Sequence, residues 1–408
     1  MKPFIYHSNA KLLVSIFFSL IMSSKGMTIE APTTLRVATF NVSMEALNYA
    51  ENIDMYTPNI NNNELSHALK SNNQQIKNIA EIIQRVKPDI ILLNEFDRVD
   101  DSATNIHYFI NNYLRKSQHN QHAINYPYFY QGSVNTGVKV NSDLNHDGKT
   151  NQLPVDTHGF GYFIGHFGMV LLSKYPIDEK AIRTFQKFKW HDMPDAVKPI
   201  NPETNQPWYT EETWQTLRLS SKSHWDIPIK INDKTIHILA SHPTPPVFDG
   251  PENRNGSRNH DEIRFWFDYI NTKQGAYIYD DNHHKGALEA DQHFIIIGDL
   301  NASHVEGDAI MTKTSKGIMA LLSSDKIQDS LPTSLGGQNH SSGNINGLYH
   351  TAYWGMRADY VLPSTFGFII KKSGVFWPQQ NKNTYRLIKN RQASSDHRLV
   401  WVDVELTE

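Results

Sequence analysis

The chain of 408 residues contains no cysteine, which excludes disulfides, a thiol nucleophile and thiolate metal ligands. Charge of either sign is nearly balanced at a net −3, so no global attraction to polyanions is expected, although a local patch can still steer a ligand. No long apolar run follows the N-terminal region, which leaves no candidate transmembrane helix in the body of the chain. The hydrophobic fraction of 39% and aromatic fraction of 11% instead suit a large core in one domain with insertions.

The first 26 residues have the pattern of a secretory signal peptide. Lys2 and Lys11 precede an apolar run at 12–22, and the small and polar residues 23–26 follow it. The run is too short to span a bilayer, so we expect export to the periplasm or the medium. No A-x-A pattern marks a cleavage site, and an uncleaved anchor is the alternative interpretation.

Residues 33–408 read as one domain built from strands and helices. Short apolar runs bounded by turn residues predict strands, and apolar residues at helical spacing predict helices. The predicted strands are 35–41, 90–96, 168–177, 235–246, 294–297, 357–364 and 394–406, and the predicted helices are 72–89 and 261–270. Two polar stretches near 97–160 and 181–224 are interpreted as insertions.

Acids, amides and histidines stand where several of these apolar runs end. The strand at 294–297 leads into Gly298, Asp299 and Asn301, a composition that by itself is typical of a turn. The same feature recurs elsewhere, at Asn41, Glu95, His242, Asp359, Asp396 and His397. The repetition indicates a shared rim where hard oxygen ligands meet two histidines, which suits Mg²⁺ and phosphate chemistry.

These segments, in this order, resemble the endonuclease/exonuclease/phosphatase superfamily, which includes DNase I-like nucleases, neutral sphingomyelinases and inositol polyphosphate phosphatases. The matching segments are TFN at 39–41, NEF at 94–96, SHP at 241–243, GDLN at 298–301, RADYVL at 357–362 and SDH at 395–397. The resemblance implies an α/β fold, a four-layer sandwich in which two mixed β-sheets pack face to face between helices.

The resemblance also implies a metal site for Mg²⁺ or Mn²⁺. Glu95 corresponds to the principal metal-binding carboxylate, with Asn41 and Asp396 beside it. A divalent cation held there would bind a phosphate oxygen and stabilise the leaving oxyanion.

The resemblance assigns catalytic roles to five further residues. Asp299 would orient or deprotonate the attacking water, and Asn301 would hold a phosphate oxygen. Asp359 would orient His397, which would act either as a base or as a stabiliser of the developing charge. His242 would protonate the leaving oxygen, whereas abasic-site endonucleases lack this histidine, so the chain leans away from that activity. A structural alternative is that His242 is only a buried strand-end residue.

The segment 246–266 offers three candidate contacts for substrate phosphate: Arg254, Arg258 and Arg264. Similar segments occur in secreted bacterial members of the superfamily. The alternative is a solvated loop in which Arg264 pairs with Asp261 or Glu262.

The sequence around 143–151 resembles the first half of a calcium loop. Asp143, Asn145 and Asp147 have the D-x-N-x-D-G spacing, but Pro154 occupies the twelfth position, where a bidentate acid is expected. A loop closed by Asp156 around a structural Ca²⁺ and an Asn/Asp-rich turn are both compatible with this pattern.

The leading hypothesis is a secreted metal-dependent phosphoesterase, with a diester favoured over a monoester. Its substrate would be a nucleic acid, a phospholipid head group or an inositol phosphate, and no protein partner is implied. Neither a basic stripe interleaved with aromatic residues nor a long apolar hairpin singles out one of these substrates. A non-catalytic binding module that keeps the fold and a calcium-binding structural protein are the alternatives.

Overall fold

The computed structural model describes residues 33–50, 60–99, 102–309 and 317–407. The predicted signal peptide at 1–26 lies outside these residues. Thr33–Glu408 form one compact unit. Among the described helices, none is long and apolar enough to cross a membrane.

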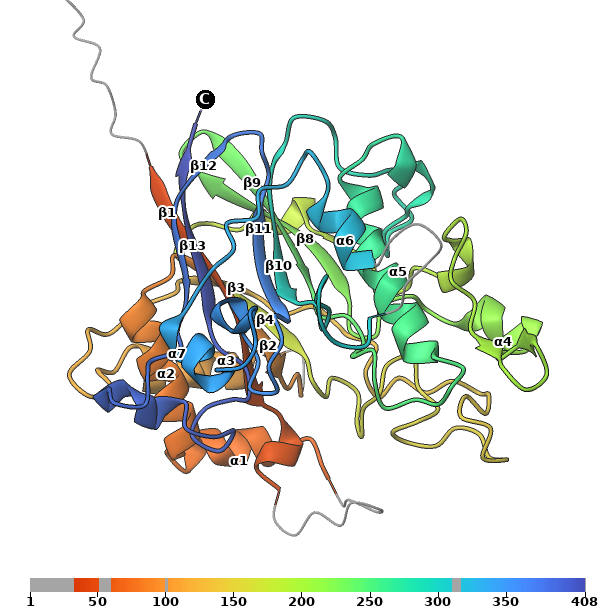
Figure 1. Ribbon diagram of the computed structural model, residues 1–408, viewed down its shortest axis with the longest axis horizontal. Coiled ribbons are helices and arrows are strands. Elements are labelled where there is room, and N and C mark those ends of the chain that lie inside the picture. The colour runs from red at the N-terminus through yellow and green to blue at the C-terminus, as the bar shows by residue number, and fades with distance from the viewer. Residues whose placement is uncertain (1–32, 51–59, 100–101, 310–316, 408) are drawn as a thin grey trace, which may run out of the picture. The chain divides into compact units, whose positions relative to one another are not determined.

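Two mixed β-sheets form the centre of the domain (Figure 1). The first sheet has the order β12-β13-β1-β2-β4-β3 and the second has the order β11-β10-β9-β8-β5. Within the sheets, β1 runs parallel to β2 and β9 runs parallel to β10, while the other pairs are antiparallel. The strands of the first sheet are β1 (Thr34–Met44), β2 (Ile90–Phe96), β3 (Tyr128–Tyr130), β4 (Met169–Ser173), β12 (Phe368–Val375) and β13 (Val400–Leu406). Those of the second are β5 (Arg183–Thr184), β8 (His224–Ile231), β9 (Lys234–Ser241), β10 (His293–Asp299) and β11 (Asp359–Pro363).

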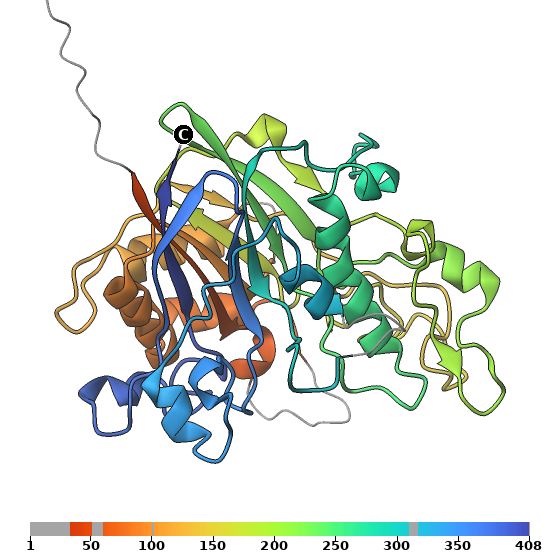
Figure 2. The same ribbon diagram turned by 45° about the horizontal axis from the view of Figure 1, so that its top comes forward.

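Helices cover the outer face of each sheet, which gives four layers (Figures 1 and 2). Beside the first sheet lie α1 (Glu64–Lys70), α2 (Gln74–Val86) and α3 (Thr104–Phe109). Beside the second lie α5 (Arg254–Tyr269) and α6 (Gly317–Leu322). The remaining helices are α4 (Glu211–Thr216) and α7 (Leu335–His340), and β6 (Ile200–Asn201) and β7 (Gln206–Pro207) form a small ribbon. The predicted four-layer α/β sandwich is confirmed.

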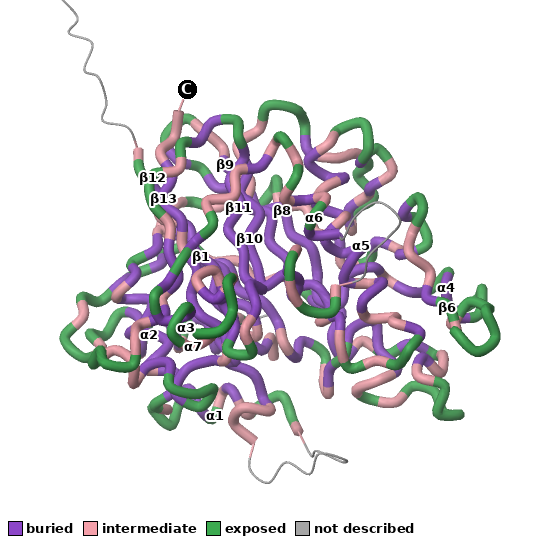
Figure 3. Tube along the Cα trace, viewed as in Figure 1, coloured by how far each residue is buried: buried purple, intermediate pink, exposed green. Residues whose placement is uncertain are grey.

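The side chains of β10 alternate between two hydrophobic clusters, one on each face of the second sheet. Ile295 and Ile297 belong to the core between the sheets, whereas Phe294 and Ile296 pack in the cluster that includes Ile263 of α5. Successive side chains of a strand point to opposite faces, and both faces of this strand are buried. That double burial explains the uninterrupted apolar run and the buried centre in Figure 3.

Several details of the fold differ from the sequence-based expectation, which did not include β8, β12 or the helices other than α2 and α5. Helix α5 begins at Arg254, seven residues before the predicted start, because its first turn is polar and is anchored by Asp249, which accepts the Asn255 amide at 2.6 Å. The polar stretches 97–160 and 181–224 are also not confined to insertions, since they supply the edge strands β3 and β5.

Candidate active site

The predicted site residues meet where the strands of the two sheets end. Asn41 of β1 is paired with Asn94 of β2, and Asp299 at the end of β10 is paired with Asp359 at the start of β11. His242 directly follows β9. Because β1 runs parallel to β2 and β9 to β10, the carboxyl ends lie at one edge of each sheet, and the Asn41–Asp299 hydrogen bond joins the two edges.

Asp299 is the centre of this group. Its Oδ2 accepts a hydrogen bond from the Asn41 side-chain amide at 3.1 Å, and its Oδ1 accepts the Asn301 backbone amide at 3.0 Å. The Nε2 atoms of His242 and His397 each lie 3.4 Å from Asp299 Oδ2. One buried carboxylate therefore contacts both predicted histidines.

His397 and Asp359 form a hydrogen-bonded pair. His397 Nδ1 lies 3.0 Å from Asp359 Oδ2, which also accepts the Thr351 hydroxyl at 2.7 Å. Because Nδ1 donates to Asp359, Nε2 is the atom that faces Asp299. The Trp354 ring packs edge-on against the imidazole, with centroids 4.8 Å apart.

Burial and neighbouring charges shift the pKa values of this centre away from their ordinary range. Burial raises the pKa of Asp299 to about 7, with Asp359 adding to the shift and the His397 charge opposing it. Burial opposes charge on His397, but Asp359 and Asp299 outweigh it and raise its pKa to about 10. At a pH between these two pKa values, Asp299 is a carboxylate and His397 is an imidazolium.

His242 has the opposite electrostatic character. Burial lowers its pKa well below the usual range, and the charges of Lys222 and His397 add to this effect. Its Nδ1 atom is buried and has no hydrogen-bond partner within the described residues, so the backbone does not satisfy the ring. His242 is therefore a neutral imidazole with one nitrogen left for a ligand.

Glu95 has the environment expected of a metal-binding carboxylate. It has a left-handed backbone, with φ of 56°, where the pairing of β1 with β2 is irregular. Within the described chain its carboxylate has no hydrogen bond or ion pair. Burial raises its pKa, and the nearby Asp396 and Glu45 carboxylates add to the shift, which His397 and Arg391 oppose.

The donor set fits a divalent cation on the Glu95 side of the site. Asp396 holds the Ser43 hydroxyl at 3.2 Å and Asn41 Oδ1 accepts the Ser43 amide at 3.2 Å, so both residues keep oxygen lone pairs available. A hard cation would relieve the repulsion among these carboxylates. Asp299, Asp359 and His397 also offer ligand atoms within 4.8 Å of one another, but the Asp359–His397 hydrogen bond already occupies two of these groups.

Asn301 is held beside the catalytic carboxylate. Its left-handed backbone, with φ of 51°, follows Asp299 closely, and its side-chain amide donates to the Pro243 carbonyl at 3.2 Å. An amide nitrogen carries two hydrogens, so one N–H remains for a phosphate oxygen.

Three charged residues that sequence analysis did not assign also lie at the site. Glu45 is buried, and its carboxylate lies 3.1 Å from His166 Nε2 and 3.1 Å from Arg391 Nη2. Arg391 Nη1 is 3.9 Å from Asp396. Lys222 is only 6% exposed, and within the described chain its ammonium has no hydrogen bond or ion pair. The only sequence signals were proximity to TFN for Glu45 and to SDH for Arg391. Lys222 lies two residues before β8, a strand that the sequence analysis did not predict.

Helix α5 positions the segments that carry Lys222 and His242. Glu262 accepts the Ser221 amide and the Thr244 amide, each at 2.6 Å. Asn259 donates to the Thr244 carbonyl at 2.8 Å and to the Leu300 carbonyl at 3.0 Å. The helix thus joins three strand ends through backbone groups.

The structure does not bring all three candidate arginines to this centre. Arg254 pairs with Glu252 and lies over Trp208. Arg264 pairs with Asp268 at 3.3 Å. The expected alternative partners of Arg264 are engaged elsewhere, because Asp261 accepts Trp190 and Val197 nitrogens and Glu262 accepts backbone amides. Only Arg258 lies near Lys222.

The candidate calcium loop is organised by its own hydrogen bonds. Asp143 accepts the amides of Asp147 and Gly148 at 3.1 and 2.8 Å, and the Asn145 side chain donates to Asp147 at 3.3 Å. Asp156 is buried and accepts two backbone amides, so it is already engaged rather than open to a cation. A Ca²⁺ ion here stays a prediction.

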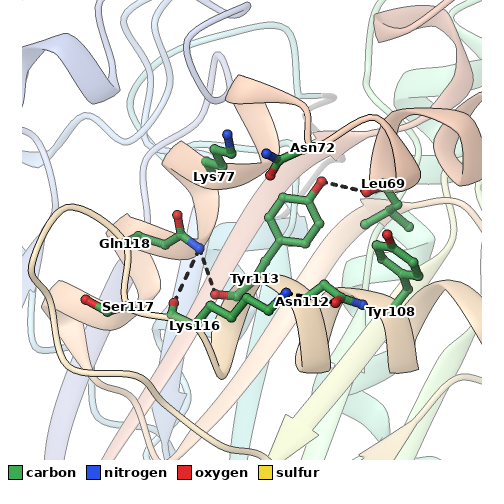
Figure 4. A pocket seen from close by; sticks show the side chains of 9 residues that line it. All are labelled: Leu69, Asn72, Lys77, Tyr108, Asn112, Tyr113, Lys116, Ser117 and Gln118. Carbon is green, nitrogen blue, oxygen red and sulfur yellow. Dashed lines mark hydrogen bonds between the residues drawn. The ribbon is translucent and has the colours of Figure 1, made fainter.

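A separate cavity of about 360 Å³ lies between α2 and the π-helical segment Ile110–Leu114 (Figure 4). Its lining contains Lys77 and Lys116 but no acid and no histidine. The cavity shares no residue with the catalytic group and lacks the side chains for hydrolysis.

Several solved structures are similar to this chain at low sequence identity. An endonuclease/exonuclease/phosphatase from Beutenbergia cavernae DSM 12333 is 16% identical, with a TM-score of 0.47, over 91% of this chain and 72% of that one. The human Nocturnin catalytic domain with bound sulfate is 13% identical, with a TM-score of 0.46, over 93% and 97%. A Staphylococcus aureus beta toxin mutant with bound magnesium ions is 13% identical, with a TM-score of 0.41, over 92% and 100%.

A comparison with curated proteins finds no match. The sequence pattern of the Endonuclease/Exonuclease/phosphatase family, in contrast, matches residues 38–397 and so includes every catalytic and metal-site residue predicted above. Members of this family are generally phosphoesterase hydrolases. The matched range covers most of the chain, and the chain belongs to the Endonuclease/Exonuclease/phosphatase family.

Proposed function

We propose that this protein is an exported, divalent-metal-dependent phosphodiesterase that hydrolyses its substrate by in-line attack of water. The observation that carries the proposal is the environment of Asp299, a buried carboxylate between the His397–Asp359 pair and His242. The proposed metal dependence is based on Glu95, Asn41 and Asp396, which would hold the cation. The proposed export is based on the signal-peptide pattern of residues 1–26.

Asp299 and His397 divide the proton and charge chemistry. The Asp299 carboxylate accepts a proton from the attacking water, and its pKa of about 7 makes it a competent base near neutral pH. The His397 imidazolium, held by Asp359, faces the negative charge that develops on the phosphoryl oxygens. This assigns charge stabilisation rather than base catalysis to His397, because its pKa of about 10 keeps it protonated.

The other groups bind the phosphate. Asn301 donates one N–H to a phosphate oxygen, and neutral His242 offers its unpartnered nitrogen. Lys222 adds a positive charge without a partner among the described residues. When bound beside Glu95, a Mg²⁺ or Mn²⁺ ion supplies Lewis-acid stabilisation of the leaving oxygen.

Hydrolysis of bis(p-nitrophenyl) phosphate with and without Mg²⁺ tests this proposal. We expect turnover that EDTA abolishes and that Glu95→Gln lowers by about 100-fold or more, because the amide removes the charge that binds the cation. Glu289→Gln, at an exposed glutamate, is the matched control and should keep full turnover. Parent-like activity of Glu95→Gln, or no metal-dependent hydrolysis of any diester, would contradict the proposal.

Natural substrates are compared by nicking of supercoiled plasmid, release of a phospholipid head group, and phosphate release from an inositol phosphate. The double variant Asn301→Ala/His397→Ala should be inactive in each assay that the parent passes. A non-catalytic binding protein would instead bind one of these ligands without turnover, and Glu95→Gln would keep that affinity.

A further inference from the structure

A group of three cations lies next to the catalytic centre without a carboxylate close enough to pair with them. Lys189, Arg218 and Arg258 come from separate segments of the chain, and within the described residues none has an acidic oxygen within 4.0 Å. Asp192, Asp281 and Glu262 exert only a longer-range attraction. The group therefore carries an excess of positive charge.

Lys189 and Arg218 are held directly opposite each other. They form an isolated antiparallel bridge, flanked by the Trp190 amide to the Leu217 carbonyl at 3.0 Å and the Leu219 amide to the Phe188 carbonyl at 2.9 Å. This arrangement is the non-hydrogen-bonded pair of an antiparallel ladder, in which side chains are closest and share one face. Like charges in such a pair destabilise the strand pairing unless an anion lies between them.

The third charge, the Arg258 guanidinium, is hydrogen-bonded to the backbone of the same bridge. Its guanidinium donates to the carbonyls of Leu219 at 2.8 Å, Arg218 at 2.9 Å and His158. Arg218 is oriented by the Asn135 side chain at 2.7 Å, and its other guanidinium donors have no partner within the described chain. Lys189 Nζ donates to the Thr216 carbonyl at 2.9 Å, so neutral carbonyl and amide oxygens rather than acids hold all three cations.

A buried histidine completes the group. His158 is 8% exposed, and its Nδ1 atom has no hydrogen-bond partner in the described part of the chain. Burial lowers its pKa to about 3, and Arg218, Arg258 and Lys189 all contribute, so all three charges act on this ring. A buried nitrogen without a partner is costly unless a ligand satisfies it.

The group is continuous with the catalytic centre. Lys222 follows Arg218 by four residues, and the Arg258 charge acts on the Lys222 ammonium, which in turn lies near Asp299 and Glu95. The intervening segment is fixed, because Glu262 of α5 holds the Ser221 amide. The charges of this group and of the catalytic centre therefore both act on Lys222.

We propose that Lys189, Arg218, Arg258 and His158 form a second phosphate subsite, which binds a phosphate group of the substrate next to the scissile one. This inference rests on the proposed phosphodiesterase function and narrows its substrates to molecules with at least two phosphates. The second group is a neighbouring phosphodiester of an oligonucleotide or a neighbouring phosphate of an inositol phosphate, and both present the same oxyanion.

The first test measures binding and needs no turnover. Fluorescein-labelled hexathymidylate and, as a competitor, inositol hexakisphosphate are titrated onto the full chain with Glu95→Gln, in the presence of Mg²⁺. Adding Arg218→Gln or Lys189→Gln should weaken the binding of one or both ligands about 10-fold. The dependence of the affinity on salt concentration should fall by the equivalent of about one phosphate contact. Arg115→Gln and Lys180→Gln, at exposed positions outside the group, are the matched controls.

The second test measures selectivity in the otherwise unaltered enzyme. The ratio of kcat/KM for hexathymidylate to that for thymidylyl-thymidine, which has a single phosphate, should fall about 10-fold in Arg218→Gln. If only the binding of hexathymidylate weakens, the second phosphate belongs to a nucleic acid. If only the binding of inositol hexakisphosphate weakens, it belongs to an inositol phosphate. Unchanged binding of both ligands, or equal losses on the one-phosphate and many-phosphate substrates, would overturn the subsite. If no diester is hydrolysed but binding depends on Arg218, the proposed function fails while the subsite stands.

Discussion

Asp299 and its neighbours show how two histidines of similar sequence context acquire different roles. Both His242 and His397 approach the same carboxylate oxygen at 3.4 Å. His397 also has Asp359 on its other nitrogen, which outweighs burial and raises its pKa, whereas burial lowers the pKa of His242 and the Lys222 charge adds to that shift. A carboxylate partner therefore keeps His397 charged, and burial without such a partner keeps His242 neutral.

Replacing Asp359 with asparagine should shift the whole pH–rate profile to lower pH. The Asp359 charge raises the pKa of both Asp299 and His397, so its removal lowers both. The acid limb, where Asp299 must lose its proton, and the alkaline limb, where His397 must keep its proton, move in the same direction. We also expect kcat to fall by about 100-fold, because His397 loses its orienting partner.

The measurement is kcat on bis(p-nitrophenyl) phosphate across the pH range. Asp403→Asn is the control, since Asp403 pairs with Arg36 on the first sheet, away from the site. A profile of unchanged position in Asp359→Asn would contradict the assigned electrostatics.

At the scale of secondary structure, the end of β10 depends on a glycine. Gly298 has φ of 155°, and a Cβ atom placed on it would lie 2.0 Å from the Ser241 carbonyl of β9. Only glycine allows the two strands to approach this closely beside His242 and Asp299. The glycine of the GDLN segment thus sets the spacing of the two catalytic strand ends.

Gly298→Ala should destabilise the protein by about 2–3 kcal/mol and reduce activity, because β9 and β10 must separate. Urea unfolding and kcat measure the two effects. Gly343→Ala, where an added Cβ meets no atom within 4 Å, should change neither. Equal stability of the two variants would show that β9 and β10 accommodate the methyl group.

The end of α2 offers a stabilising change. Lys87 is exposed and ends the helix in the left-handed conformation, with φ of 56° and ψ of 50°. Lys87→Gly should raise the free energy of unfolding by about 0.5–1 kcal/mol, because glycine adopts this conformation without strain.

Lys77→Gly, inside the same helix, is the opposing control and should cost about 1 kcal/mol. Urea unfolding measures both variants. A loss of stability in Lys87→Gly would contradict the strain argument.

At the scale of the whole molecule, buried neutral histidines link stability to pH. Burial lowers the pKa of His224 to about 4, with its Nε2 bonded to the Glu262 carbonyl at 2.8 Å. His158 and His166 are also buried, and their pKa values fall to about 3. Because the unfolded chain binds protons more readily at these sites, their contribution is complete above the unfolded pKa and is lost as pH falls.

His224→Gln isolates one of these contributions. Between pH 7.5 and pH 5, the parent should lose about 2 kcal/mol more stability than the variant, since an unfolded histidine protonates near pH 6.5. Urea unfolding at the two pH values measures the difference. Equal losses in the parent and the variant would show that His224 accepts a proton without unfolding.

Local sequence determined β1, β2, β4, β9, β10, β11 and β13 and the polar residues at their ends, but not β8 or β12. Short apolar runs such as 90–96 and 294–297 have few structural alternatives to a buried strand. The order of segments from TFN to SDH indicated the family and the residues that surround Asp299. The short edge strands β3 and β5 carry too few residues for a period, and the polar start of α5 has no apolar stripe, so these escaped prediction.

Only the tertiary structure decided which charges face one another. Lys189, Arg218 and Arg258 form no basic stripe in the sequence, yet one bridge and one helix bring them together beside Lys222. Glu45 and Arg391 meet although they lie near opposite ends of the domain. Electrostatic interactions act over a few ångströms between side chains that only the packing of strands, helices and loops brings together. The sequence therefore specified the catalytic groups, while the fold specified their charge states and their neighbours.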